Sequence, residues 1–144
     1  MLPIINGEFG VVADPELRFS DKGSAWIKVR GIAKDRVRDS TGNWSDGDPL
    51  FIDILHGGQA AEHLFESITK GDTITVTGKL KQREYEKDGE KRTVIEIRAD
   101  SIGVSVRWTT AKTPKTLEEA SGGGVKAVAD ALGAEIIEQT EAPF

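Results

Sequence analysis

Residues 71–108, GDTITVTGKLKQREYEKDGEKRTVIEIRADSIGVSVRW, decide how this chain folds. Within them, residues 73–77 alternate β-branched apolar and polar side chains, a pattern typical of a strand with one buried face. Gly78 interrupts the alternation, as glycine does where a strand bends at a barrel corner, and residues 79–85 resume it. This stretch therefore predicts the first arm of a long β-hairpin.

The second arm follows a tight turn, Lys87-Asp88-Gly89-Glu90. Asp-Gly predicts such a turn because these residues supply the positive φ angles that a two-residue hairpin loop requires. Residues 91–98 alternate again and predict the return strand. A further, closing strand is expected to end near Trp108.

One face of the hairpin carries a row of cations that ends in an aromatic ring. Lys79, Lys81, Arg83 and Tyr85 share this face because strand side chains repeat every second residue. Such a row suits single-stranded nucleic acid, since cations neutralise phosphates and a ring stacks on a base. The row is equally consistent with a solvated face that keeps an exposed strand soluble. The hairpin alone leaves both interpretations open.

The composition narrows the class of protein. A chain of 144 residues predicts one domain with a substantial core. It has no cysteine and two histidines, so we expect no disulfide, no metal site and no cofactor. It also lacks an apolar run of about 18 residues and a signal-peptide pattern, which predicts a cytoplasmic protein that does not enter a membrane.

The net charge of −5 argues against a uniformly basic nucleic-acid binder. Residues 109–144 contain three lysines and six acidic residues, so they carry −3 and the rest of the chain carries −2. Because residues 1–108 are together close to neutral, a nucleic-acid-binding site must come from local cationic patches.

The N-terminal part predicts two strands, over residues 2–13 and 25–32. The second alternates cleanly and places Trp26, Lys28 and Arg30 on one face. This face pairs an aromatic with two cations, as the hairpin does. Trp26 is expected either to stack on nucleic acid or to pack against a neighbouring subunit or loop.

The middle of the chain completes the expected order of elements. Residues 34–49 are polar and predict a long loop or an extended hairpin around Trp44, and residues 50–55 predict a third strand. Helical spacing over residues 59–70, with Gly71 as a stop, predicts a helix. Three strands, a helix and the two strands of the hairpin are the order of the all-β OB-fold, a five-stranded Greek-key barrel with one helix between strands three and four.

The composition changes after the predicted barrel. We expect residues 1–112 to form the OB-fold domain and residues 113–144 to form a flexible linker and acidic tail, because Gly122-Gly123-Gly124 is typical of a flexible segment. The tail ends in Pro143-Phe144.

Several short motifs occur in a specific order along residues 2–112. They are Ala13-Asp14-Pro15-Glu16-Leu17-Arg18-Phe19, Thr41-Gly42-Asn43-Trp44, Phe51-Ile52-Asp53, Gly78-Lys79-Leu80-Lys81-Gln82-Arg83 and Gly89-Glu90-Lys91-Arg92-Thr93-Val94-Ile95-Glu96. This series resembles the bacterial-type single-stranded-DNA-binding proteins, and most closely their actinobacterial members or a bacteriophage relative.

The resemblance implies a homo-oligomer of OB-folds, with a tetramer favoured over a dimer, that binds single-stranded DNA without sequence preference in replication, recombination and repair. Family members stack DNA on aromatics that match Phe51 and Tyr85, and Trp44 matches a loop aromatic. The tail tip would dock on replication and repair proteins through Glu138, Glu141, Pro143 and Phe144. The candidate DNA-binding residues are Trp26, Lys28, Arg30, Trp44, Phe51, Lys79, Lys81, Arg83, Tyr85, Lys87, Lys91 and Arg92.

The chain also departs from the family pattern. Gly57 stands where the family usually has a second aromatic, and Gly58 where a basic residue is common. A missing stacking ring costs about 1–3 kcal/mol per base, and Trp26 is a candidate to compensate for it. The tail end carries Glu135, Glu138 and Glu141 without a block of aspartates, so partner docking is expected to be weaker or differently tuned.

The leading functional hypothesis is therefore a non-enzymatic single-stranded-DNA-binding protein. The alternative is an OB-fold protein-interaction subunit of a replication or recombination complex with weak DNA binding, which the near-neutral body and Gly57 favour. An enzyme is disfavoured because the sequence has no Walker-type phosphate loop and no nucleophile–histidine spacing.

Overall fold

The computed structural model describes residues 1–113, of which Met1–Ala111 form one compact unit. The elements of this unit are β1 (Ile4–Val11), β2 (Glu16–Phe19), β3 (Ala25–Ala33), β4 (Arg36–Arg38), β5 (Trp44–Asp46), β6 (Leu50–Gly57), α1 (Gln59–Ser67), β7 (Thr73–Lys87) and β8 (Glu90–Val104). None of the helices in this described part is long and apolar enough to cross a membrane.

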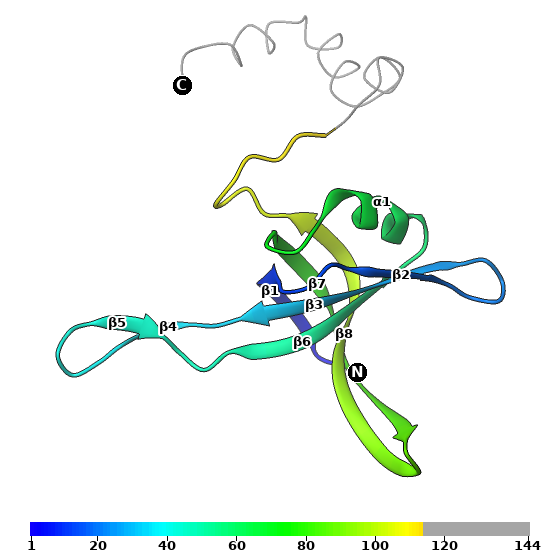
Figure 1. The fold of residues 1–144 in the computed structure, drawn as a ribbon, viewed down its shortest axis with the longest axis horizontal. Coiled ribbons are helices and arrows are strands. Elements are labelled where there is room, and N and C mark those ends of the chain that lie inside the picture. The colour runs from blue at the N-terminus through cyan, green and yellow to red at the C-terminus, as the bar shows by residue number, and fades with distance from the viewer. Residues whose placement is uncertain (114–144) are drawn as a thin grey trace, which may run out of the picture. The chain divides into compact units, whose positions relative to one another are not determined.

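The main sheet closes on itself. Its strand order is β1-β7-β8-β6-β3-β2, and β1 pairs with β3 as well as with β7. The β6–β8 pairing is parallel, with Ile54 opposite Ile97, and the other pairings of the main sheet are antiparallel. β1, β3, β6, β7 and β8 thus form a five-stranded barrel with α1 between the third and fourth of these strands (Figure 1). The predicted OB-fold is confirmed.

Strand alternation fills the barrel with β-branched side chains. Ile27, Ile54, Ile74 and Ile97 come from four different strands and are fully buried. The helix α1 adds Ala61 and Leu64 to this core. The helix ends at Ser67, three residues earlier than predicted, because the next residue is already extended and buries its own side chain in the core.

The separate closing strand predicted from the sequence is wrong. β8 is one continuous strand, which first pairs with the outer part of β7 and then closes the barrel. The β7–β8 register shifts between Thr77 and Gly78: Thr77 lies opposite Ser101 and Gly78 opposite Ala99, which leaves Asp100 as the extra residue of a bulge. A bulge increases local twist and bends a strand, so one strand can serve both the hairpin and the barrel.

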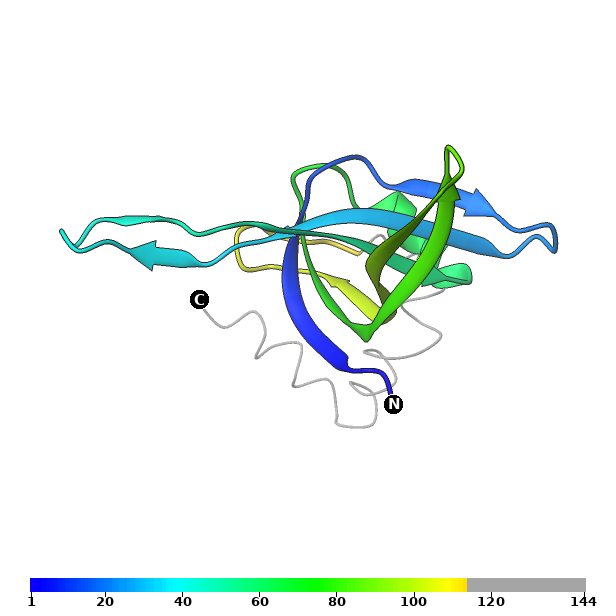
Figure 2. The ribbon, with the colours of Figure 1, turned by 90° about the horizontal axis from the view of Figure 1, so that it is seen from below.

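Long hairpins extend from the barrel, and two of them correspond to stretches singled out in the sequence (Figures 1 and 2). The outer parts of β7 and β8 form the first, and its predicted turn is confirmed by positive φ angles of 55° at Asp88 and 78° at Gly89. β4 and β5 form the second, so residues 34–49 are the extended hairpin rather than an unstructured loop. β2 is a strand of its own that pairs with β3.

Candidate nucleic-acid interface

The outer face of β3 carries the predicted combination of an aromatic and two cations. Along this strand, buried apolar residues alternate with the exposed side chains of Trp26, Lys28 and Arg30, as the sequence predicted. On the neighbouring strand β6, Phe51 and Asp53 follow the same alternation on the outer side. The barrel wall therefore places aromatic and charged groups side by side.

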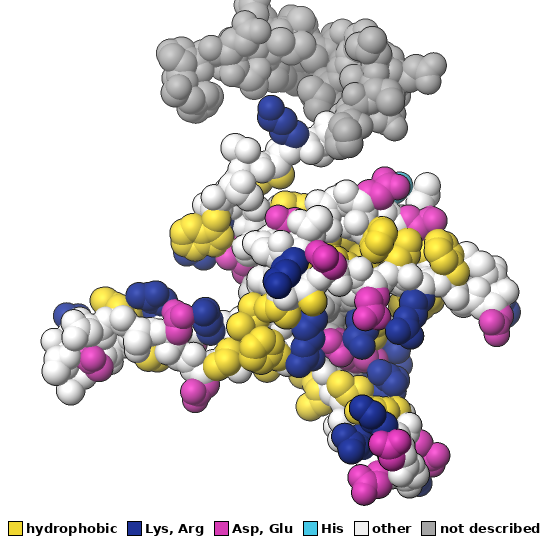
Figure 3. Space-filling view, viewed as in Figure 1, with side chains coloured by type: hydrophobic (Ala, Val, Ile, Leu, Met, Phe, Trp, Pro, Cys, Tyr) yellow, Lys and Arg dark blue, Asp and Glu magenta, His cyan; other side chains and the backbone are white. Residues whose placement is uncertain are grey.

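The outer arm of β7 continues this face. Lys79, Lys81, Arg83 and Tyr85 are exposed, and the intervening Leu80 packs against the core. In the space-filling view, lysine and arginine side chains gather between the barrel and the β7–β8 hairpin and along the β4–β5 hairpin (Figure 3). At the tip, Arg92 lies opposite Tyr85, Lys91 opposite Glu86 and Lys87 opposite Glu90, and all three cations are exposed.

Each of the four candidate aromatics lies next to an arginine. The distances from guanidinium carbon to ring centroid are 5.5 Å for Arg98–Trp26, 5.7 Å for Arg30–Phe51, 5.7 Å for Arg83–Tyr85 and 5.8 Å for Arg38–Trp44. A cation within about 6 Å of a ring is attracted by its π-electrons. Each ring can therefore stack on a flat apolar group while the arginine beside it binds an anion.

Two carboxylates hold four of the cations on this face. Asp53 lies 3.7 Å from the Lys28 Nζ and 3.2 Å from an Arg30 guanidinium nitrogen. The buried Glu96, 1% exposed, lies 3.4 Å from the Arg83 Nε and 3.3 Å from Arg98. Because Asp53 and Glu96 are themselves paired neighbours on β6 and β8, they form a fixed anionic strip beneath the cations.

These pairs qualify the expectation for Lys28, Arg30 and Arg83. The sequence predicted cations that neutralise phosphates, and in the structure each is already partly neutralised by a carboxylate. Their side chains remain 45–48% exposed, so they stay accessible to a ligand. The carboxylates fix the positions of the cations, but they also reduce the net positive charge of this face.

The β4–β5 hairpin has its own local order. The pKa of Asp39 is lowered most by a hydrogen bond from the Thr41 hydroxyl, and next by one from the Asn43 backbone N–H. A hydrogen bond from Lys34 lowers the pKa of Asp46. Both carboxylates thus accept hydrogen bonds that hold the arm that carries Trp44 in place.

Sequence reasoning missed several residues of this face. Arg18, Leu55 and Arg98 line a shallow pocket beside Trp26, and Asp53 and Glu96 hold the neighbouring cations. Residues 91–98 alternate in the sequence, but only the β6–β8 register brings Glu96 and Arg98 next to β6. The predicted partner-binding residues Glu138, Glu141, Pro143 and Phe144 lie outside the described residues.

Comparison with known proteins decides the family. A model described as "Single-strand binding protein family" matches residues 7–105. The chain belongs to this family. Its resemblance to actinobacterial members is confirmed: it is 45% identical over 107 residues to a protein of Mycobacterium leprae named "Single-stranded DNA-binding protein", and 46% identical to its Mycobacterium tuberculosis counterpart.

These alignments cover 73% of this chain and 64–65% of the mycobacterial single-strand binding proteins, so the match spans slightly less than two thirds of those relatives. Among solved structures, the small single-stranded DNA-binding protein of Streptomyces coelicolor superposes with a TM-score of 0.63 at 26% identity, over 74% of this chain and 96% of that one. A single-stranded DNA-binding protein mutant of Thermus aquaticus gives a TM-score of 0.60 at 27% identity, over 73% of this chain and 50% of that one.

Proposed function

We propose that this protein binds single-stranded DNA without sequence preference, by stacking bases on exposed rings and neutralising phosphates with the cations beside them. The observation that carries the proposal is the pairing of four exposed aromatics, Trp26, Trp44, Phe51 and Tyr85, each with its own arginine. Every base has a flat face and every nucleotide one phosphate, so a ring with a neighbouring cation suits any sequence.

The wider role follows from the proposed activity and from the sequence. We propose that the protein protects single-stranded DNA during replication, recombination and repair, and recruits partners through Glu138, Glu141, Pro143 and Phe144 at the C-terminal end. Self-association, with a tetramer favoured, is supported by apolar side chains exposed near the N-terminus, such as Leu2 and Ile4. Light scattering with and without oligonucleotide measures the oligomeric state.

The direct test is fluorescence anisotropy of labelled oligo-dT in titrations with the full-length protein. We expect binding at low salt that weakens as salt rises, because each phosphate contact releases counterions. A duplex of the same length is the comparison and should bind much more weakly, since its bases are already stacked on each other. Equal binding of both DNAs, or no binding of oligo-dT at low salt, would refute the proposal.

Asp53→Asn should strengthen oligo-dT binding at low salt and steepen its salt dependence. The change keeps the shape of the side chain but releases Lys28 and Arg30 from their carboxylate partner. Each additional phosphate contact raises the magnitude of the log–log salt slope by about 0.7 for single strands. Binding isotherms at four or more salt concentrations measure the slope.

Asp21→Asn is the matched control for Asp53→Asn. It makes the same change in net charge at an exposed position in the β2–β3 connection. If both variants steepen the slope equally, the effect comes from overall charge, and the Asp53 ion pairs do not limit phosphate contact.

The second candidate function is a protein-interaction OB module with weak DNA binding. The partial neutralisation of Lys28, Arg30, Arg83 and Arg98 by Asp53 and Glu96 favours it. This function predicts that removal of the stacking rings leaves the modest DNA affinity almost unchanged.

A further inference from the structure

Trp26 lies on top of Gly57. The two residues are direct partners on the neighbouring strands β3 and β6. A β-carbon built on Gly57 would lie 3.2 Å from two ring carbons of Trp26 and 3.3 Å from a third. Such contacts are tighter than ordinary van der Waals packing, so the indole occupies the space above residue 57 because that residue has no side chain.

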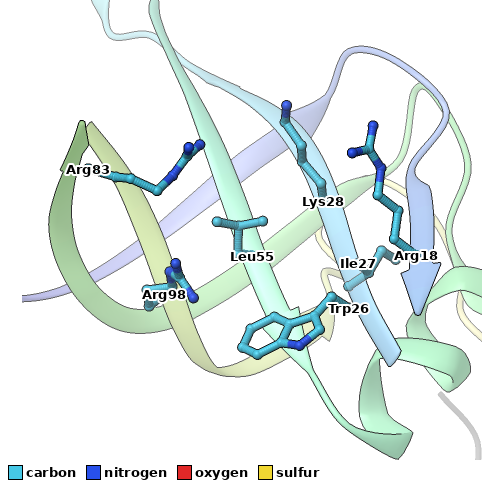
Figure 4. Close-up of a pocket in the computed structure, with 7 residues that line it drawn as sticks. All are labelled: Arg18, Trp26, Ile27, Lys28, Leu55, Arg83 and Arg98. Carbon is cyan, nitrogen blue, oxygen red and sulfur yellow. The ribbon is translucent and has the colours of Figure 1, made fainter. Parts of the chain in front are cut away.

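The ring is held there but remains accessible. The Arg98 guanidinium lies 5.5 Å from its centroid, and 41% of Trp26 is exposed. Figure 4 shows the ring over β6, with Arg83 and Arg98 on one side and Lys28 and Arg18 on the other. A large aromatic side chain that is fixed at one end and half exposed is suited to contact a flat apolar ligand.

The surroundings of Trp26 form a shallow pocket of about 280 Å³. Trp26 and Leu55 provide its apolar part, and Arg18, Lys28, Arg83 and Arg98 provide its charged part. This volume is near the lower limit of small-molecule sites, which is about 300 Å³, so the pocket fits one small group. The flat ring of Trp26, with cations on both sides, suits a nucleotide base that has one phosphate before it and one after it in the strand.

We propose that this pocket is a single-nucleotide subsite, with Trp26 as its stacking platform and Gly57 as the residue that lets the platform lie on the sheet. The proposal rests on single-stranded-DNA binding as the function and adds where one base is held. It also explains the glycine at position 57: the ring above this position comes from β3 instead of from β6.

The cations of the pocket differ in how tightly the protein holds them. Arg83 and Arg98 share the buried Glu96, and Lys28 is paired with Asp53. Arg18 pairs with Glu16, and both of these side chains are largely exposed. The Glu96 pairs preorganise one side of the subsite, whereas Arg18 is free to move toward a phosphate on the other side.

The first test compares Trp26→Ala with Trp108→Ala by anisotropy of labelled oligo-dT. Trp108 is a matched control because it is also an exposed tryptophan with an arginine beside its ring, 5.0 Å away, but lies outside the pocket. Trp26→Ala should weaken binding about 5- to 150-fold, the value of one base stack, and Trp108→Ala less than about twofold. Equal affinities of the two variants would overturn the subsite.

The second test leaves Trp26 in place. In the variant Trp44→Phe/Trp108→Phe, Trp26 is the only tryptophan of the chain, and oligo-dT should quench its fluorescence. Adding Gly57→Ala should reduce both the quenching and the affinity, because the new methyl group pushes the ring off the sheet. Unquenched Trp26 in a protein that still binds oligo-dT would refute the subsite and leave the proposed function intact. Failure of the wild-type protein to bind oligo-dT would refute the function itself.

Discussion

Phe51→Ala/Tyr85→Ala should weaken oligo-dT binding at low salt by at least about thirtyfold. Each base stack on an aromatic side chain contributes about 1–3 kcal/mol, and tenfold in affinity corresponds to about 1.4 kcal/mol. Two lost stacks therefore remove at least about 2 kcal/mol. The expected effect is large because the arginines beside the rings, Arg30 and Arg83, also lose the surface that orients them.

The double variant should fold normally. Phe51 is 48% and Tyr85 36% exposed, and neither belongs to the buried core of the barrel. Thermal melting followed by circular dichroism measures this, and anisotropy of labelled oligo-dT measures the affinity.

Phe65→Ala is the control for this double variant. Phe65 is an exposed aromatic of similar accessibility, but it lies on α1 rather than on the sheet. Its replacement should leave the affinity unchanged. Should the double variant bind oligo-dT as well as the Phe65 variant does, base stacking on the sheet is not the source of affinity, and the protein-interaction module becomes the better interpretation.

Local pattern in the sequence predicted most of the elements of this protein and the outer face of β3. Period-two alternation correctly placed Trp26, Lys28 and Arg30 on the outside of β3, and Asp88-Gly89 correctly marked the hairpin turn. These features depend on residues close together in the chain, and the order of elements then limited the fold to the OB-fold.

Which residues come together at the site could not be predicted in the same way, because this depends on pairing between strands that are distant in the sequence. Asp53 and Glu96 are 43 positions apart, and only the parallel register of β6 and β8 makes them neighbours. The position of Trp26 over Gly57 likewise follows from the antiparallel register of β3 and β6. A one-residue slip would move each of these side chains to the other face, and alternation alone does not fix the register.

The bulge in β8 was missed for a related reason. Gly78 interrupts the alternation of β7, whereas no residue pattern in its partner strand marks an extra residue. The sequence pattern therefore predicts a return strand and a separate closing strand in place of one strand with a bulge. In the structure the irregularity lies in the pairing, where Thr77 and Gly78 face Ser101 and Ala99, and the chain of β8 continues through it.

Gly78→Ala should lower the free energy of unfolding by about 3 kcal/mol, the upper part of the range for overpacked sites. A β-carbon at this position would collide with the carbonyl oxygen of Arg98 and would lie 2.7 Å from the Ala99 Cα. Both atoms belong to the backbone of the paired strand, so they cannot rotate away as a side chain does. For a domain of about 100 residues, this loss corresponds to a fall in Tm of roughly 12–24 °C.

Gly103→Ala separates this clash from the general effect of replacing a strand glycine. Gly103 lies further along β8, and a β-carbon there would meet only the Thr75 Oγ1, at 3.2 Å. The Thr75 side chain can rotate about its Cα–Cβ bond and move this oxygen away, so the Gly103 variant should melt within a few degrees of the wild type. Thermal melting of both variants measures the difference. Equal melting temperatures would mean that the β7–β8 ladder shifts to admit the methyl group, and then Gly78 and the bulge opposite it do not fix where the barrel ends and the cationic hairpin begins.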